Sequence, residues 1–175
     1  MLVVAATERE LAHIRGVETL CCGVGPVEAA ARTARSLAER RPETVLHIGL
    51  AGARGIEPPA LVLGSESVYA DVQDPSSTFP RVERLEPDAG LLARVHAALP
   101  EARLLPIGTA GRVGGGSCSV EAMEGFGVLR ACVLAGIPAV ELRVISNDVD
   151  EPDRGKWLFD EALDLLGEAV ERVIG

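Results

Sequence analysis

The sequence predicts an α/β fold: a single domain over residues 1–175, arranged as a three-layer sandwich around a mostly parallel mixed sheet. Apolar segments of strand length alternate with amphipathic helical segments, a pattern typical of parallel sheets with helices on both faces. The chain has 175 residues and is 47% hydrophobic, which is enough for one packed core. No internal repeat or linker divides it.

The first half of the chain shows this alternation clearly. Residues 1–6 predict a strand, and Thr7 followed by Glu10 forms a capping-box pattern at the start of a short helix. Pro26 stands near the first position of a longer helix, where proline is favoured. Three more segments are expected here: strands over 17–23, 43–49 and 60–72, the last bent or bulged at Gly64, with a turn over 50–55.

The second half contains a polar stretch and then the most informative segment. The expected elements are a surface loop over 73–88, a helix over 88–99, a strand over 102–111, a glycine-rich connector over 112–119 and a terminal helix over 153–174. Residues 120–147 lie between the last two. They place acidic residues around Met123, continue as an apolar helix and return as a buried strand that ends in polar residues.

Composition and charge exclude several classes of function. The formal net charge is −9, so the chain lacks the basic surface that nucleic-acid binding needs. No apolar run reaches the roughly 18 residues of a membrane span, and the N-terminal residues lack a basic leader, so a cytoplasmic location is expected. The four cysteines and three histidines have no metal-ligand spacing. Neither a metal nor another cofactor is expected, and a small-molecule enzyme fits best.

Strand direction predicts where a ligand would bind. In α/β sheets, ligands lie outside the carboxyl ends of the strands. This rule brings four segments to one edge, namely residues 6–10, 23–26, 49–52 and 146–147. The glycine turn at 23–26 lacks the third glycine of a dinucleotide fingerprint, so NAD binding is not expected. A phosphate at the following helix N-terminus remains compatible with the sequence.

The order of short motifs resembles the purine nucleoside phosphorylase and nucleosidase superfamily, and within it the futalosine hydrolases. The matching segments are AATEREL (5–11), GVGPVEAA (23–30), HIGLAGA (47–53), VEAMEG (120–125), ELRVISND (141–148) and KWLFDEAL (156–163). VEAMEG is close to the VExMEG form of futalosine hydrolases, whereas adenosine-type nucleosidases carry VEMEA. ELRVISND resembles their RAISD, with Asn147 in place of the aspartate. Leu50 stands where those enzymes carry a serine.

The resemblance implies hydrolysis of futalosine to hypoxanthine and dehypoxanthine futalosine, in menaquinone biosynthesis. Cleaving an N-glycosidic bond builds positive charge on the ribose and negative charge on the departing purine, and preformed groups must stabilise both. Glu124 is the candidate carboxylate beside the sugar, and Glu10 is the candidate base that takes a proton from water. The expected substrate-binding residues are Ala6, Leu50, Ala51, Gly52, Met123, Arg143 and Ser146.

Asn147 is the candidate for recognising the base. A carboxamide can accept a hydrogen bond at its oxygen and donate one from its nitrogen. It therefore complements the N7–H and 6-oxo groups of hypoxanthine or guanine better than it complements adenine.

Several structural alternatives remain open. Glu10 could serve only as a capping residue, and Asn147 could simply form a turn. Glu121 is expected to be a helix-start acid that interacts with the helix dipole, and Arg143 could anchor a loop through an ion pair.

Other functions compete with the leading one. These are a 6-oxopurine nucleoside phosphorylase with phosphate at Gly23–Pro26, a methylthioadenosine or adenosylhomocysteine nucleosidase, which Asn147 disfavours, and a non-catalytic purine-binding protein. The resemblance also implies a homodimer or higher homo-oligomer. The benzoate of futalosine would need a cation, and Arg54, Arg81 and Arg112 are the candidates.

Overall fold

The computed structural model describes residues 1–72, 76, 78–116 and 118–175. Its elements in chain order are β1 (Leu2–Ala5), α1 (Glu8–Leu11), β2 (Glu18–Cys21), α2 (Pro26–Arg40), β3 (Val45–Ala53), β4 (Ala60–Tyr69), β5 (Arg84–Leu85), α3 (Ala89–Ala98), β6 (Arg103–Thr109), β7 (Val120–Ala122), α4 (Gly125–Ala135), β8 (Ala139–Asp148), the 3-10 helix η1 (Arg154–Lys156) and α5 (Phe159–Ile174). In this part of the chain, no helix is long and apolar enough to cross a membrane.

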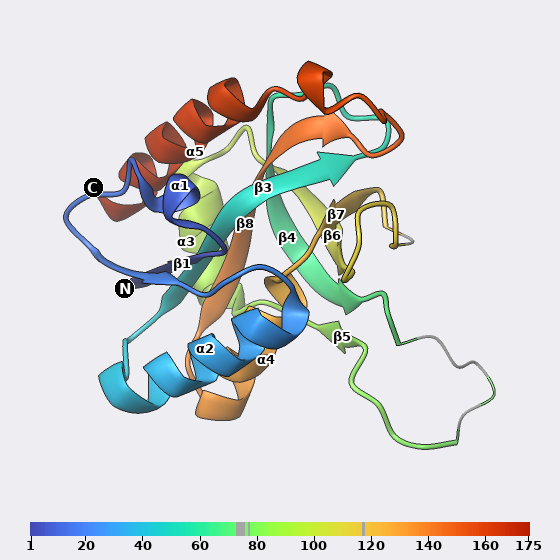
Figure 1. Ribbon diagram of the computed structural model, residues 1–175. Helices are drawn as coiled ribbons and strands as arrows, with labels where there is room; N and C mark the ends of the chain where they lie inside the picture. The colour runs from blue at the N-terminus through green and yellow to red at the C-terminus, as the bar shows by residue number, and fades with distance from the viewer. Residues whose placement is uncertain (73–75, 77, 117) are drawn as a thin grey trace.

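The strands form one eight-stranded mixed sheet (Figure 1). Its order is β2-β1-β3-β7-β6-β4-β5, and β8 pairs with both β3 and β4. Five of the pairings are parallel and three are antiparallel, so the predicted mostly parallel mixed sheet is confirmed. Because β8 joins β3 to β4 on one side while β7 and β6 join them on the other, these five strands close into a ring. The ring was not apparent from the sequence.

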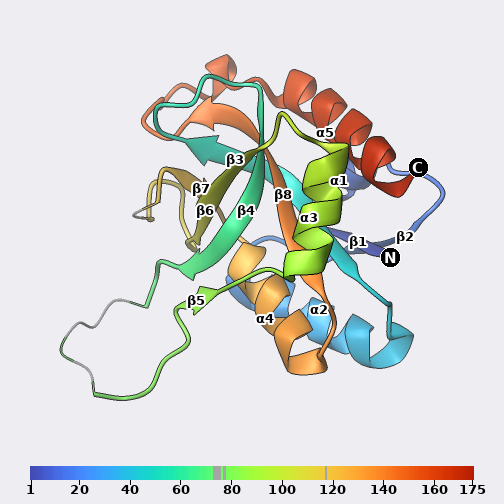
Figure 2. The same ribbon diagram turned by 180° about the vertical axis from the view of Figure 1, so that it is seen from behind.

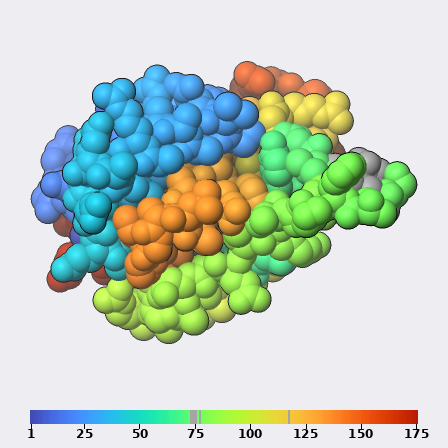
Figure 3. All heavy atoms as spheres, turned by 90° about the horizontal axis from the view of Figure 1, so that it is seen from below, coloured from blue at the N-terminus to red at the C-terminus, as the bar shows by residue number. Residues whose placement is uncertain are grey.

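Helices cover both faces of the sheet, as the three-layer prediction requires. α2 and α4 lie side by side on one face (Figure 3), and α1, α3 and α5 lie on the other (Figures 1 and 2). Along β1, Val3 packs toward α3 and α5, whereas Leu2 and Val4 pack toward α2 and α4. This alternation is the two-residue period of a strand, and burial on both faces explains why β1 is apolar throughout.

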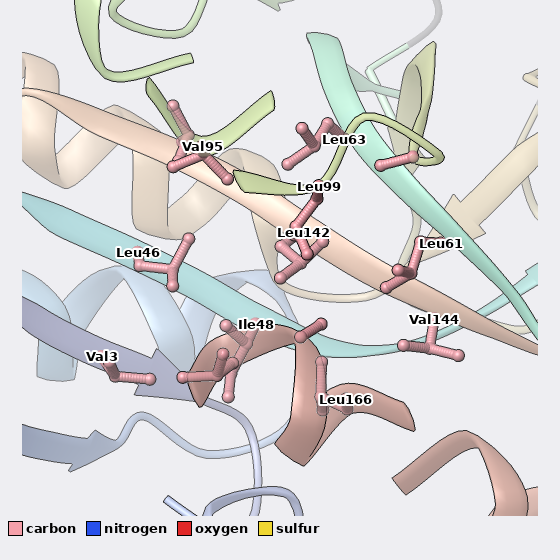
Figure 4. Close-up of a cluster of buried hydrophobic side chains, with 14 of the residues drawn as sticks. Val3, Leu46, Ile48, Leu61, Leu63, Val95, Leu99, Leu142, Val144 and Leu166 are labelled. Atoms are coloured by element: carbon pink, nitrogen blue, oxygen red, sulfur yellow. The ribbon is translucent and has the colours of Figure 1, made fainter. Parts of the chain in front are cut away.

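The larger core lies between the sheet and α1, α3 and α5 (Figure 4). It joins Leu46 and Ile48 of β3 to Leu142 and Val144 of β8 and to Leu166 of α5. Fully burying each such side chain stabilises the fold by about 1.5–3 kcal/mol. This packing fixes the positions of β3 and β8, whose carboxyl ends carry predicted site residues.

A glycine allows α2 and α4 to approach closely. An added Cβ at Gly127 of α4 would collide with the carbonyl oxygen of Pro26, the first residue of α2. The close approach brings the start of α4 next to the turn that precedes α2. It thereby positions Glu124, the N-cap residue of α4, beside Gly25.

Several local predictions are confirmed. The capping box between Thr7 and Glu10 is present, and Pro26 occupies the first turn of α2. The β4–β6 register shifts between Gly64 and Glu66, which agrees with the irregularity expected at Gly64. Part of the expected loop over 73–88 and of the connector over 112–119 lies outside the described residues.

Two boundaries were predicted wrongly. β3 continues through residues 50–53, where a turn was expected, because its backbone pairs there with both β7 and β8. α5 begins at Phe159 rather than at residue 153, since η1 and an extended Trp157 come first. The short strands β5 and β7 were not predicted. Both are too short to show a strand period, and they depend on tertiary pairing.

Candidate active site

A pocket opens at the carboxyl ends of β1, β3 and β8, beside the start of α4. Its lining includes residues from all four segments that strand direction is expected to bring together. Nine of the ten predicted site residues line it: Ala6, Glu10, Leu50, Ala51, Gly52, Met123, Glu124, Ser146 and Asn147. The tenth, Arg143, is fully buried and contacts Glu124 from behind the pocket wall.

Glu10 is held from two directions. Its Oε2 atom accepts hydrogen bonds from Thr7 N–H at 3.0 Å and from Thr7 Oγ1 at 2.8 Å. Its Oε1 atom accepts from Leu50 N–H of β3 at 3.1 Å. Glu10 is therefore both a capping residue and a pocket residue, although the sequence presents these as alternatives. Three donors occupy three of the roughly four acceptor positions of a carboxylate, which leaves one for a ligand or a water molecule.

Glu124 is placed by long-range contacts. It is the N-cap residue of α4, but its side chain makes no hydrogen bond to its own helix. Instead, Oε1 accepts from Gly25 N–H at 3.1 Å, and Oε2 lies 3.6 Å from Arg143 Nη2. Burial raises the pKa of the Glu124 carboxyl, and although Arg143 and the Gly25 N–H act in the opposite direction, the net shift is upward.

Arg143 connects Glu124 to two further buried polar groups. Its Nε donates to Glu141 Oε1 at 2.8 Å, and its Nη2 lies 2.6 Å from His47 Nε2. Burial favours a lower pKa for Arg143, but the charges of Glu141, Glu124 and Glu10 outweigh burial and raise it. The guanidinium is thus a permanent cation behind the pocket.

His47 is a neutral imidazole in this network. Its Nδ1 lies 3.0 Å from the carbonyl oxygen of Val4, which can only accept, so Nδ1 carries the proton and Nε2 accepts from Arg143. Burial and the nearby Arg143 charge hold the pKa of His47 well below its ordinary value. The tautomer of His47 therefore fixes the direction of one Arg143 N–H bond.

Two glycines make room for these charged groups. An added Cβ at Gly49 would overlap Arg143 Nη1 and would come within 2.7 Å of Glu10 Oε1. An added Cβ at Gly125 would overlap the carboxylate of Glu141. The glycines of the HIGLAGA and VEAMEG segments therefore have a steric cause, which is close packing around Arg143.

A β-bulge directs Ser146 and Asn147. In the β3–β8 pairing, Ala51 pairs with Ile145 and Gly52 pairs with Asn147, so Ser146 has no partner. As a result, both Ser146 and Asn147 line the pocket, although successive strand residues normally face opposite ways.

The Asn147 carboxamide has a defined orientation. Its Nδ2 donates to the carbonyl oxygen of Asp148 at 2.9 Å, and its Oδ1 accepts from Ser146 Oγ at 2.9 Å. Because a carbonyl oxygen can only accept, the nitrogen must face Asp148. Each end of the amide retains one hydrogen-bonding position.

Glu121, Trp157 and Phe159 are three of the lining residues that were not among the predicted site residues. Glu121 lines the pocket from β7, so its expected position at a helix start is wrong. Trp157 and Phe159 line it from the segment before α5 and at the first residue of that helix, with ring centroids 5.5 Å apart. The KWLFDEAL resemblance was the available signal for the two aromatic residues. No signal in the sequence indicated that Glu121 lies in a strand.

The three candidate cations for a distal carboxylate have different environments. Arg54 is paired with Glu121 at 2.5 Å and lies 3.6 Å from Asp150. Arg81 is paired with Glu83 at 2.6 Å. Arg112 lines the pocket, and among the described lining residues it is the one cation.

The described residues offer neither a metal-binding cluster nor an ionised thiol at Cys22 or Cys132. Within the described ranges, no cluster of three or more His, Cys, Asp or Glu side chains could hold a metal ion. Burial raises the pKa of Cys22 and of Cys132 to about 12, so both are protonated thiols at neutral pH.

Similarity to known proteins identifies the superfamily to which this chain belongs. The family model of the phosphorylase superfamily matches residues 13–117. Among solved structures, futalosine hydrolase of Helicobacter pylori in mutant form has a TM-score of 0.87 at 17% identity, covering 99% of this chain and 97% of that one. The methylthioadenosine/adenosylhomocysteine nucleosidase of Streptococcus pneumoniae has a TM-score of 0.86 at 17% identity, with coverage of 99% and 97%. The chain is thus an α/β protein of the phosphorylase superfamily.

Sequence relatives narrow this class. The chain is 33% identical to futalosine hydrolase of Streptomyces coelicolor, covering 90% of this chain and 78% of the relative. It is 31% identical to futalosine hydrolase of Thermus thermophilus, covering 87% and 78%. The chain therefore belongs to the futalosine hydrolase family.

Proposed function

We propose that this protein hydrolyses the N-glycosidic bond of futalosine and releases hypoxanthine and dehypoxanthine futalosine. The observation that carries the proposal is one pocket that holds two carboxylates, Glu10 and Glu124, together with the neutral carboxamide of Asn147. The identity to two futalosine hydrolases supports the choice of substrate. The structure-based matches at 17% identity support only the fold.

Glu124 acts on the sugar in this scheme. As the bond between C1′ and the purine nitrogen breaks, its electron pair leaves with the base and positive charge develops on the ribose. The Glu124 carboxylate, with Oε1 held by Gly25 N–H, accepts hydrogen bonds from the 2′- and 3′-hydroxyls and stabilises that charge. Met123, from the same segment, packs against the ribose. Arg143 contacts Glu124 from behind, and its positive charge opposes the upward pKa shift that burial causes.

Glu10 activates the water. Its carboxylate has one remaining acceptor position, which takes a proton as a water oxygen attacks C1′ from the face opposite the purine. The donors from Thr7 and Leu50 hold the carboxylate in place, so little reorganisation is needed during the reaction. Ala6, Leu50 and Ala51 line the pocket beside Glu10.

Asn147 and Ser146 recognise the base. The purine takes a proton from solvent water at N7 as it departs. The free position on Asn147 Oδ1 then accepts from this N7–H, and the free N–H of Nδ2 donates to the 6-oxo group. Ser146 and Asp148 hold the amide in the orientation that this pairing requires. Gly52 has no side chain, which lets the Asn147 amide lie close to the β3 backbone.

The glycine turn favours hydrolysis over phosphorolysis. A phosphorylase would need an anion site at Gly23–Pro26, but the Gly25 N–H already donates to the Glu124 carboxylate. A phosphate there would lie against a negative charge. Arg32, near this turn, is already paired with Glu28 at 2.5 Å.

The resemblance to futalosine hydrolases extends the proposal to the biology of the protein. We place the reaction in menaquinone biosynthesis, in the cytoplasm, catalysed by a homodimer or higher homo-oligomer without a metal or other cofactor. Arg112, which lines the pocket, is the proposed partner for the benzoate of the substrate. Size-exclusion chromatography with light scattering tests the assembly, and a monomer would contradict it.

The deciding experiment measures base release from futalosine, inosine and methylthioadenosine, each with and without phosphate. We expect hypoxanthine from futalosine at a rate that phosphate does not change. A requirement for phosphate would indicate a phosphorylase, and release of adenine from methylthioadenosine alone would indicate an adenosine-type nucleosidase. No release from any of the three would favour a binding protein.

A further inference from the structure

Glu121 is a buried acid that neither the fold nor the proposed catalytic scheme uses. It is 7% exposed and lines the pocket from β7. Its Oε1 atom accepts from Arg54 Nη1 at 2.5 Å. Its Oε2 atom is buried and has no hydrogen-bond partner among the described residues. An unsatisfied buried acceptor is destabilising. A hydrogen-bond donor on a bound ligand would satisfy this oxygen.

The strand register places Glu121 at the base end of the pocket. Gly52 of β3 pairs directly with Glu121 of β7 on one side and with Asn147 of β8 on the other. Side chains of directly paired residues point to the same face of a sheet. Glu121 and Asn147 therefore flank Gly52, and two strand spacings of about 4.8 Å separate their backbones by roughly 10 Å.

The central residue, Gly52, contributes no side chain between them, and the side chains of Asn147 and Val149 lie close to its Cα. An added Cβ at Gly52 would come within 3.0 Å of Asn147 Nδ2 and of Val149 Cγ2. Val149 and Val113 also line the pocket and offer apolar contacts for a flat ring. In the arrangement argued below, a planar base lies between Glu121 and Asn147 with one edge toward each of them.

The edge of a 6-oxopurine matches this pair of side chains. Next to the 6-oxo group, hypoxanthine carries N1–H, a donor, whereas adenine has a bare N1 that can only accept. A carboxylate can only accept. We propose that Glu121 is a specificity-determining residue whose Oε2 accepts a hydrogen bond from N1–H of a 6-oxopurine. This inference rests on the proposed function and extends it to the base edge that Asn147 does not reach.

Arg54 offsets the negative charge of the Glu121 carboxylate at this position. The purine leaves with extra electron density, and an unpaired carboxylate beside it would oppose that charge. The Arg54 guanidinium, at 2.5 Å from Oε1, balances the charge of Glu121, and Oε2 is left without a protein partner among the described residues. A purely structural ion pair would not explain why this oxygen remains unpaired in a pocket wall.

The test compares the binding of free hypoxanthine and free adenine by isothermal titration calorimetry in the wild-type protein and in Glu121→Gln. Because Arg54 holds the amide oxygen in the variant, the amide NH₂ faces the base. Hypoxanthine then loses its acceptor and should bind about 10- to 100-fold more weakly. Adenine gains a donor and should bind more tightly. Opposite changes for the two bases cannot come from a general loosening of the pocket, which would weaken both.

Glu66→Gln is the matched control. Glu66 is also a strand glutamate paired with an arginine, Arg84, at 2.5 Å, and it does not line the pocket. This variant should bind both bases as the wild-type protein does. If Glu121→Gln weakens both bases equally, or leaves hypoxanthine unchanged, the inference is overturned.

Turnover separates this inference from the proposed function. In Glu121→Gln, the ratio of kcat/KM for futalosine to that for its 6-amino analogue should fall at least tenfold. If the wild-type protein binds hypoxanthine in preference to adenine but releases no base from futalosine, the proposed function fails while the assignment of Glu121 stands. If the wild-type protein binds the two bases equally, the assignment fails whatever the protein hydrolyses.

Discussion

The pocket contains two carboxylates that the fold positions in different ways. Glu10 is held mainly by its own neighbourhood, because Thr7, three residues away, supplies two of its three donors. Glu124 has no local partner. Its contacts are Gly25, 99 residues away in sequence, and Arg143 on β8.

This difference has consequences for the chemistry of each group. Glu10 retains its geometry as long as the first helix begins correctly. Glu124 depends on the close packing of α2 against α4 and on the buried Arg143 network, and its burial raises its pKa. Local structure therefore positions Glu10, the proposed general base, and tertiary structure positions Glu124, the proposed sugar-binding acid.

Removing the locally held carboxylate should have the largest effect. Glu10→Ala is expected to lower kcat/KM for futalosine by about 10²–10⁴-fold, the usual contribution of a general base.

Thr7→Ala sharpens the comparison because it removes the capping hydroxyl and keeps the Glu10 carboxylate. It should lower the free energy of unfolding by about 1 kcal/mol, with a much smaller loss of turnover because Leu50 N–H still holds Glu10. Equal losses of turnover in both variants would argue that Glu10 is only a capping residue.

Replacing the distantly held carboxylate should have a similar or slightly smaller effect. Glu124→Gln keeps the shape and the acceptor for Gly25 N–H but removes the charge beneath the sugar. We expect kcat to fall by about 10²–10³-fold, as for loss of one electrostatic group, while binding of free hypoxanthine remains unchanged. Single-turnover assays and calorimetry measure the two quantities. A loss below tenfold would exclude a role for Glu124 in stabilising the transition state.

The tertiary dependence of the Glu124 region can be tested through Gly125. Gly125→Ala places a methyl group against the Glu141 carboxylate, and it should lower the free energy of unfolding by about 1–3 kcal/mol. Gly90→Ala is the control, because a Cβ at this position of α3 meets only Asp88 Oδ1 at 3.5 Å. That variant should be neutral or stabilising by up to about 1 kcal/mol. Equal destabilisation in urea would contradict the steric argument.

The smallest expected effect is on pH dependence. The reaction needs ionised Glu124, and burial raises its pKa, so kcat/KM should begin to fall at a higher pH than for an ordinary glutamate as the solution is acidified. Glu141 adds to this shift as a nearby like charge. Glu141→Gln removes that charge and should move the acid limb of the profile to lower pH. A shift to higher pH would mean that Glu141 acts mainly through the position of Arg143.

Much of the fold could be predicted because its signals are local. Alternating apolar segments gave the parallel strands and the covering helices, and the residues at Thr7, Pro26 and Asp88 mark real helix starts. Strand direction also predicted that four segments meet at the carboxyl ends of the strands. The elements that were missed, β5 and β7, are two and three residues long, and such short strands exist only where a partner strand is available.

The sequence by itself determined the α/β class, the capping box of Glu10 and the residue types of the pocket, because each depends on neighbours a few positions apart. Tertiary structure alone decided that five strands close into a ring, that a bulge turns both Ser146 and Asn147 inward, and that Glu121 belongs to the pocket wall. The physical reason is that backbone pairing between distant strands sets which way a side chain points, and a shift of one residue reverses it.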